Sequence, residues 1–163
     1  MKNFQISAIL LLLAIALIPA CFPKKESSKT SAITPSAKGD ATALALLKTN
    51  CLNCHATDSK SHDDLIAPPI IAVKRRYSAV YTEREDFIRH IIDWAKKPTE
   101  DKAIMYGAVN RFKIMPYLKF EEKDLRRIGA YLYDNEVEQP AWFEEHFKEM
   151  HPDGNASQAP VKN

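Results

Sequence analysis

Apolar residues recur at three- and four-residue spacing in three segments of the chain, and this spacing predicts an amphipathic helix in each. The first helix follows Asp40, whose carboxylate can cap its amino end, and it leads into Cys51. The second begins at the capping-box sequence 82–85 and stops at 96–98, and the third spans about 121–135. Their apolar positions are Leu44, Leu47 and Cys51, then Phe87, Ile88, Ile91, Ile92 and Ala95, and finally Leu125, Ile128 and Leu132.

Gly129 stands in the middle of the third predicted helix, where a glycine costs about 1 kcal/mol relative to alanine. A close crossing with another helix would compensate for this cost. We expect the first helix to be the partner, through its apolar residues Ala43, Leu44 and Leu47.

The amino-terminal segment is typical of an export signal, because Lys2 precedes an apolar run, 6–18, that is too short to span a bilayer stably. The sequence Ile-Pro-Ala-Cys ending at Cys21 resembles the bacterial lipoprotein processing site. We therefore predict a lipoprotein-type signal peptide over 1–20 and a lipid on Cys21, with ordinary signal cleavage nearby as the open alternative. Both place the protein outside the cytoplasm, on the periplasmic side of the cell envelope.

Residues 21–39 are rich in Lys, Ser, Thr and Pro and offer almost nothing to bury, so we predict a flexible tether. The formal net charge of the chain is +2, too near neutral to indicate a nucleic-acid partner. The charge is equally too small to indicate binding to an acidic membrane surface, so the only membrane contact predicted is the lipid on Cys21.

The segment 51–55, Cys-Leu-Asn-Cys-His, carries the most specific chemistry in the sequence. Two thiols at this spacing, followed at once by an imidazole, are typical of the attachment of a c-type haem. Cys51 and Cys54 would each bond one vinyl group, and His55 would supply a nitrogen to the iron. The alternatives are a redox dithiol, which would need a neighbouring βαβ pattern, and a zinc site, which would need a second ligand pair. The sequence shows neither, and we predict one covalently attached haem c.

Two further features bear on the ligation of the iron. The segment 66–70 contains two consecutive prolines, which hold the chain extended and leave carbonyls free to accept from the far ring nitrogen of His55. Met115, in a predicted loop over 110–116, precedes a proline and can present its thioether stiffly. Met105 is the competing methionine, but it falls in a short helix predicted over 101–109 and suits core packing better. His62 and His90 are expected to be ordinary loop and surface histidines.

With these residues placed, residues 40–135 resemble the class I c-type cytochromes, particularly the small bacterial monohaem electron carriers. Three signals follow the order of that family: the Cys-x-x-Cys-His motif, then Ala67-Pro68 where the family has Gly-Pro, then Met115-Pro116 ahead of the last helix. The resemblance implies an all-α class I cytochrome c fold, with its first and last helices crossing near Gly129 and the haem in a cleft. It also implies that the Pro68 carbonyl orients His55 and that Met115 is the second axial ligand.

Residues 136–163 lie beyond the resemblance. A short amphipathic helix is predicted early in this extension, and it would cover exposed core or the haem edge, or dock a partner. Its apolar and aromatic positions are Pro140, Trp142, Phe143, His146, Phe147 and Met150. The residues after Pro152 are polar, and we predict a disordered tail.

The resemblance implies a carrier of single electrons, not an enzyme, whose partners are redox proteins or a terminal oxidase or reductase. Two alternatives stay open: a haem-bearing subunit of a larger redox complex, or a gas-binding sensor if the sixth position on iron is open. Basic residues that could form a docking rim are Lys74, Arg75, Arg76, Lys96, Lys97, Arg111 and Lys113.

Overall fold

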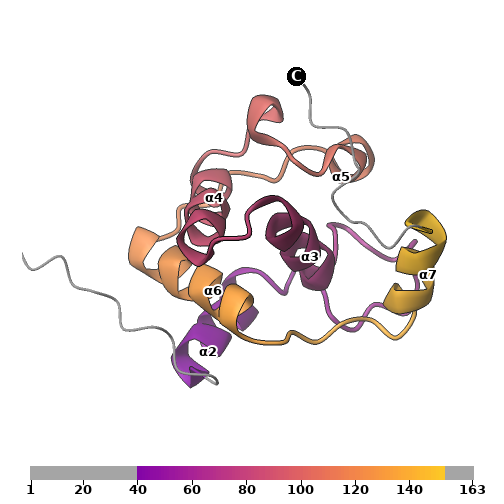
Figure 1. Ribbon diagram of the computed structural model, residues 1–163, viewed down its shortest axis with the longest axis horizontal. Helices are drawn as coiled ribbons and strands as arrows, with labels where there is room; N and C mark the ends of the chain where they lie inside the picture. Colours follow the sequence, from indigo (N-terminus) through magenta and orange to yellow (C-terminus); the bar gives the residue numbers. More distant parts are fainter. Residues whose placement is uncertain (1–39, 153–163) are drawn as a thin grey trace, which may run out of the picture. The chain divides into compact units, whose positions relative to one another are not determined.

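The computed structural model describes residues 40–152, whose regular structure is entirely helical, with no strand in this part of the chain (Figure 1). The prediction of an all-α fold is confirmed for these residues. The helices are α2 (Ala41–Asn50), α3 (Ile70–Val80), α4 (Arg84–Lys96), α5 (Tyr106–Phe112), α6 (Glu122–Asp134) and α7 (Phe143–Met150), with a 3₁₀ turn, η1, at Glu100–Lys102. None of these helices is long and apolar enough to cross a bilayer.

The predicted signal peptide, the lipidated Cys21 and the tether all lie outside the described residues, as does the tail after Pro152. The outcomes reported below therefore concern residues 40–152.

Helix α2 begins as its sequence predicts. The Asp40 carboxylate accepts hydrogen bonds from the backbone N–H groups of Thr42 (3.0 Å) and Ala43 (3.1 Å), which satisfies two donors that the first turn leaves unpaired. Ala43 and Leu47 are buried on one side of the helix. The apolar face of α2 thus packs against the core and carries the chain directly to Cys51.

Helix α6 packs against both α2 and α4, and α3 joins this group. The side chains buried between these helices are Ala43, Leu47, Ile70, Tyr77, Phe87, Ile88, Ile91, Ile92, Ala95, Leu125, Ile128, Ala130, Tyr131 and Leu132. The helical periods that predicted α2, α4 and α6 therefore mark the residues that form the core.

Gly129 does allow a close helix crossing, but the expected partner is wrong. A Cβ atom at position 129 would lie 3.4 Å from both Cα and Cγ2 of Ile88, which belongs to α4. Helix α2 also contacts α6, so the first and last predicted helices do pack together, but the residue that packs against Gly129 belongs to α4.

The capping box predicted for α4 does not form. The helix begins at Arg84, and Glu83 at its amino end makes no side-chain cap. Arg84 instead donates two hydrogen bonds to the Asp134 carboxylate, Nε to Oδ1 at 2.9 Å and Nη2 to Oδ2 at 2.7 Å, and the Tyr133 hydroxyl donates to the Thr82 carbonyl (2.8 Å). Contacts with the end of α6 therefore fix the start of α4 in place of a local cap.

The segment between α4 and α6 differs from the sequence prediction, which placed a helix at 101–109 and a loop at 110–116. Ala103 is extended and buried, and the helix α5 starts only at Tyr106. The Arg76 side chain donates a hydrogen bond from Nε to the Ile104 carbonyl (2.8 Å), so this oxygen is used by α3 and not by a local helix. Helix α3 itself was not predicted, although Pro69 at its amino end suits a helix start.

Candidate cofactor site

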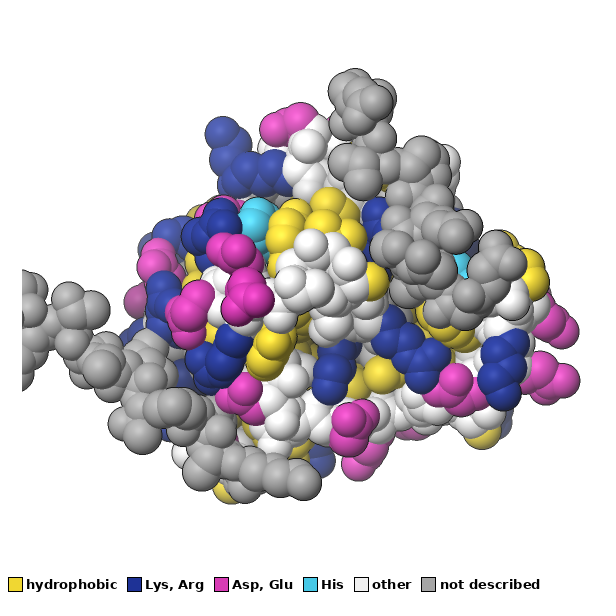
Figure 2. Space-filling view, in the orientation of Figure 1, with side chains coloured by type: hydrophobic (Ala, Val, Ile, Leu, Met, Phe, Trp, Pro, Cys, Tyr) yellow, Lys and Arg dark blue, Asp and Glu magenta, His cyan; other side chains and the backbone are white. Residues whose placement is uncertain are grey.

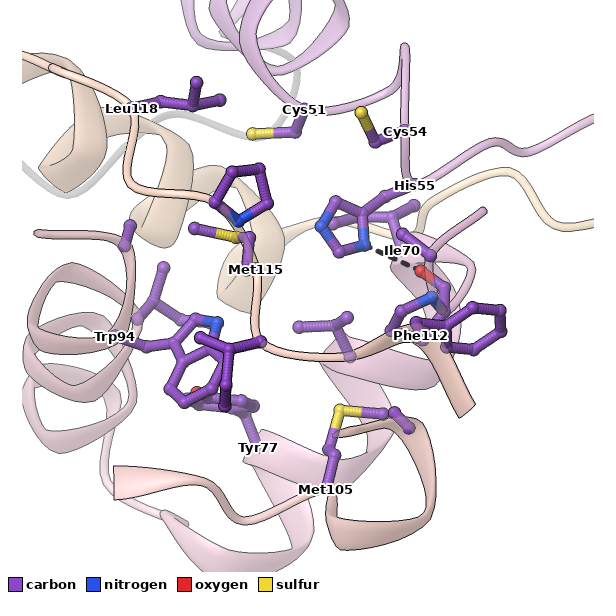
Figure 3. A pocket seen from close by; sticks show the side chains of 18 of the residues that line it. Cys51, Cys54, His55, Ile70, Tyr77, Trp94, Met105, Phe112, Met115 and Leu118 are labelled. Carbon is purple, nitrogen blue, oxygen red and sulfur yellow. Dashed lines mark hydrogen bonds between the residues drawn. The ribbon is translucent and has the colours of Figure 1, made fainter. Parts of the chain in front are cut away.

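A cavity of about 190 Å³ lies among α2, α3, α4, α5 and α6, and most of its lining is apolar (Figure 3). It brings together segments that are far apart in the sequence, including the Cys-x-x-Cys-His motif and the Met115-Pro116 segment. The lining includes Cys51, Cys54, His55, Pro68, Tyr77, Trp94, Met105, Phe112 and Met115.

The motif forms a tight turn at the end of α2. The backbone N–H groups of Cys51 and His55 donate to the carbonyls of Leu47 and Cys51, each at 2.9 Å, and Cys54 N donates to Cys51 O at 3.2 Å. This turn places both sulfurs at one end of the cavity (Figure 3). Both cysteines are free thiols, Cys51 half-buried and Cys54 exposed.

The environment of Cys51 differs from that of a reactive redox thiol. Burial raises the pKa of Cys51 to about 11, and the neighbouring Cys54 adds to the rise. A redox dithiol needs a cysteine whose pKa is lowered, so that the reactive thiolate is populated near neutral pH. In residues 40–152 there is also no cluster of three or more His, Cys, Asp or Glu side chains that could hold a metal ion.

His55 is oriented by the main chain of the proline segment. Its Nδ1 lies 2.7 Å from the Pro68 carbonyl oxygen, so Nδ1 carries the proton and donates it. The hydrogen bond predicted from the sequence is thus confirmed. The other ring nitrogen is left without a proton and faces into the cavity, toward Met115 (Figure 3). Burial lowers the pKa of His55, with the Pro68 hydrogen bond opposing the shift, and this favours the neutral imidazole that a metal requires.

Met115 enters the cavity from the segment that follows α5. Lys113 ends α5 with φ of 69°, the only residue other than glycine with positive φ in the described chain, and its N–H donates to the Val109 carbonyl (2.9 Å). This left-handed residue turns the chain so that the half-buried Met115 lines the cavity opposite His55 (Figure 3).

Met105 also lines the cavity, which differs from the prediction that it packs within a short helix. It precedes the first turn of α5 and lies at the end of the cavity away from the two cysteines (Figure 3). The facing pair in the structure is therefore His55 and Met115, while Met105 forms part of the opposite wall.

Tyr77 and Trp94 place polar groups within the mostly apolar lining. The Tyr77 hydroxyl and the Trp94 indole N–H make no hydrogen bond to any residue between 40 and 152, and both side chains line the cavity near one another (Figure 3). Each group could therefore donate a hydrogen bond to a ligand with acceptor atoms at this end of the cavity.

Neither of the histidines set aside from ligation lines the cavity. The His62 ring lies 4.4 Å from that of His146, and the His90 ring stacks on Tyr81 with centroids 3.6 Å apart. Their positions agree with the expectation that they are loop and surface residues.

The basic docking rim suggested by the sequence is largely engaged elsewhere. Arg76 is buried, and Lys74 donates to the Asn135 carbonyl. Arg75 pairs with Glu144 of α7, and Lys96 pairs with Glu122. On the face seen in Figure 2, basic and acidic side chains are interspersed and form no large region of one sign. Arg76 therefore cannot belong to an exposed rim, whereas Lys97, Arg111 and Lys113 are exposed.

The mouth of the cavity carries apolar side chains instead. Ile66 (68% exposed) and Leu118 (44% exposed) line the cavity and also reach solvent, and Tyr117 (66% exposed) lies beside Leu118 in the chain. The extension helix α7 contributes no residue to the lining.

Comparison with known proteins gives no relative for this chain: no protein-family model, no curated protein and no solved structure matches it.

Proposed function

We propose that this chain is a monohaem electron carrier of the class I c-type cytochrome kind. The observation that carries the proposal is the facing of His55 and Met115 across an apolar cavity, with the two motif sulfurs at one end. In this proposal Cys51 and Cys54 hold one haem c through thioether bonds, and His55 and Met115 are its axial ligands.

The residues present fit such a group. A closed void of about 190 Å³ would cost about 5 kcal/mol at 24 cal/mol per Å³, which is an upper bound here because the mouth of the cavity is open to water. That is a large share of the 5–15 kcal/mol by which a domain is typically stable. The unpaired Tyr77 hydroxyl and Trp94 indole supply donors for the carboxylates of haem, and the rest of the lining suits its apolar ring.

Haem iron supplies the redox step, the gain and loss of one electron. The chain contributes ligand geometry and environment. The Pro68 carbonyl fixes the tautomer and orientation of His55, which raises the basicity of the ligating nitrogen. The Met115 thioether would favour the ferrous state, and the apolar walls would keep most of the group away from water. With both axial positions filled by protein, the site suits electron transfer and not substrate binding.

The surroundings of the cavity support a partner that is itself a redox protein, or a terminal oxidase or reductase. The exposed Cys54 and the apolar mouth formed by Ile66 and Leu118 leave one edge of the cavity accessible. The predicted export signal and the lipid on Cys21 would place this domain on the periplasmic side of a membrane. No nucleic-acid partner is part of this proposal.

Absorption spectra of the purified protein in both oxidation states test the proposal. We expect haem that resists denaturing extraction, and replacing Cys51 and Cys54 together with Ala should abolish this resistance. We also expect the reduced wild-type protein to bind carbon monoxide poorly. Ready binding of carbon monoxide would replace the carrier with the gas-binding alternative, and covalent haem in the double variant would refute the attachment.

A further inference from the structure

The loop 59–64, which we call the bracing loop, is held from outside by the extension helix α7. The Trp142 indole N–H donates to the Ser59 carbonyl at 2.9 Å. The rings of His62 and His146 lie 4.4 Å apart, and Trp142 makes an edge contact with His62 at 5.8 Å. The Ser61 hydroxyl closes the loop by donating to the Asp64 carboxylate (2.9 Å). The loop therefore has a fixed support although much of it is exposed.

Helix α7 is itself anchored to α3 by contacts of Arg75, and the two helices are neighbours in Figure 1. The Arg75 guanidinium lies over the rings of Phe143 (5.0 Å) and Phe147 (4.7 Å) and forms two hydrogen bonds to the Glu144 carboxylate. Phe143 is buried. This combination of stacking, ion pairing and burial makes α7 a firm support and not a frayed end.

The bracing loop also reaches the segment that carries Met115. Arg111 of α5 donates from Nη2 to the His62 carbonyl at 3.0 Å and to Asp63 Oδ1 at 3.3 Å. Asp63 is 92% exposed, so its pairing contributes little, and the bond to the carbonyl is the stronger restraint. Phe112, next to Arg111, lines the cavity, and Lys113 then turns the chain toward Met115.

In sequence the bracing loop connects His55 to Pro68, and in space Arg111 ties it to the end of α5. We infer that Arg111 and Trp142 are positioning residues for Met115: α7 holds the bracing loop through Trp142, and the loop holds the Met115 segment through Arg111. The extension thus acts on the sixth iron position without lining the cavity. This inference rests on the proposed function.

Two full-length variants test it in the haem-containing protein. Arg111→Gln removes the charged donor, and Trp142→Phe keeps an aromatic ring but loses the N–H. Added imidazole should displace Met115 about fivefold faster in each variant than in the wild type. The loss of the sulfur-to-iron band of the ferric protein monitors this displacement. Because both residues act through one loop, the double variant should accelerate the displacement of Met115 by less than the product of the two single accelerations. Arg111→Lys, which can still donate to the carbonyl, should restore most of the wild-type rate.

Matched controls separate this role from a general loss of stability. Asp63→Asn removes only the negative charge of the exposed partner of Arg111 and should leave the rate within twofold of wild type. Arg89→Gln breaks the Arg89–Asp86 pair (2.6 Å) on the surface of α4 and should also have no effect. Equal acceleration by Arg89→Gln, or no acceleration by Arg111→Gln, would overturn the inference.

Amide hydrogen exchange provides a readout that does not depend on haem. In whatever state the protein is purified, Arg111→Gln should speed exchange both in the bracing loop and at 113–118, and Trp142→Phe should do the same. Faster exchange confined to the bracing loop would refute the link to Met115. A protein that holds no haem would refute the proposed function, while the exchange pattern would still decide whether Arg111 restrains that segment.

Discussion

Haem-free protein should be far less stable than the haem-containing form, because the cavity among α2–α6 then has no ligand to fill it. The cavity of about 190 Å³ corresponds to a loss of at most about 5 kcal/mol in the free energy of unfolding at 24 cal/mol per Å³, because its open mouth lets water fill part of it. For a domain of this size, such a loss lowers the midpoint of thermal unfolding by up to roughly 20 °C.

The assay is a thermal melt followed by far-ultraviolet circular dichroism on three samples. These are the haem-containing protein, the wild-type chain produced without haem, and the variant with Cys51→Ala and Cys54→Ala. The two haem-free samples should melt at similar temperatures, well below the haem-containing protein, since the cysteine side chains themselves contribute little. Cys21→Ser is the control and should leave the midpoint unchanged. Equal midpoints for the haem-free and haem-containing forms would show that the cavity does not need a ligand.

Three further predictions concern the ligand, the extension and the anchor. Met115→Ala should lower the reduction potential, remove the sulfur-to-iron band and admit carbon monoxide, whereas Met105→Ala should leave all three unchanged; the reverse result would exchange their roles. Hydrogen bonds from Arg75 and Gln139 lower the pKa of Glu144. The docking of α7 should therefore be intact above the ordinary carboxyl pKa and weaken as the pH falls below about 4.5. The free energy of docking lost in this way should be under about 1 kcal/mol. Near-ultraviolet circular dichroism, compared between the wild type and Trp142→Phe to isolate the signal of Trp142, measures this, and a Glu144→Gln variant that still shows the acid transition would contradict it. Cys21→Ser should move the protein from membrane to soluble fractions, and a wild-type protein that is already soluble would exclude the anchor.

The sequence predicts the parts of the fold that depend on local pattern. The helical spacing of apolar residues locates α2, α4 and α6, and Asp40 caps α2 because its acceptor and the donors lie within three residues. The two consecutive prolines indicated only that a carbonyl of 66–70 could accept from His55, and the family resemblance implied that this carbonyl is that of Pro68, as the structure has it.

The errors arise where distant residues decide the local structure. Arg84 bonds Asp134 across 50 positions, and this contact replaces the capping box. Arg76 takes the Ile104 carbonyl, so α5 starts later than its sequence suggests. The neighbour of Gly129 depends on how α4 and α6 are rotated about their axes, which no local pattern specifies. The same holds for the bracing loop, because its partner Trp142 is 83 residues from Ser59.

The acceptor for His55 is a main-chain oxygen, and this affects how the chain can vary. No substitution at position 68 deletes that oxygen, so mutational drift can change the residue while the hydrogen bond persists, provided the backbone keeps its path. The orientation of the imidazole is therefore robust to point mutation in a way that a side-chain acceptor could not be. For the same reason the hydrogen bond is hard to recognise from the residue at position 68, because many residue types at that position can supply the main-chain oxygen.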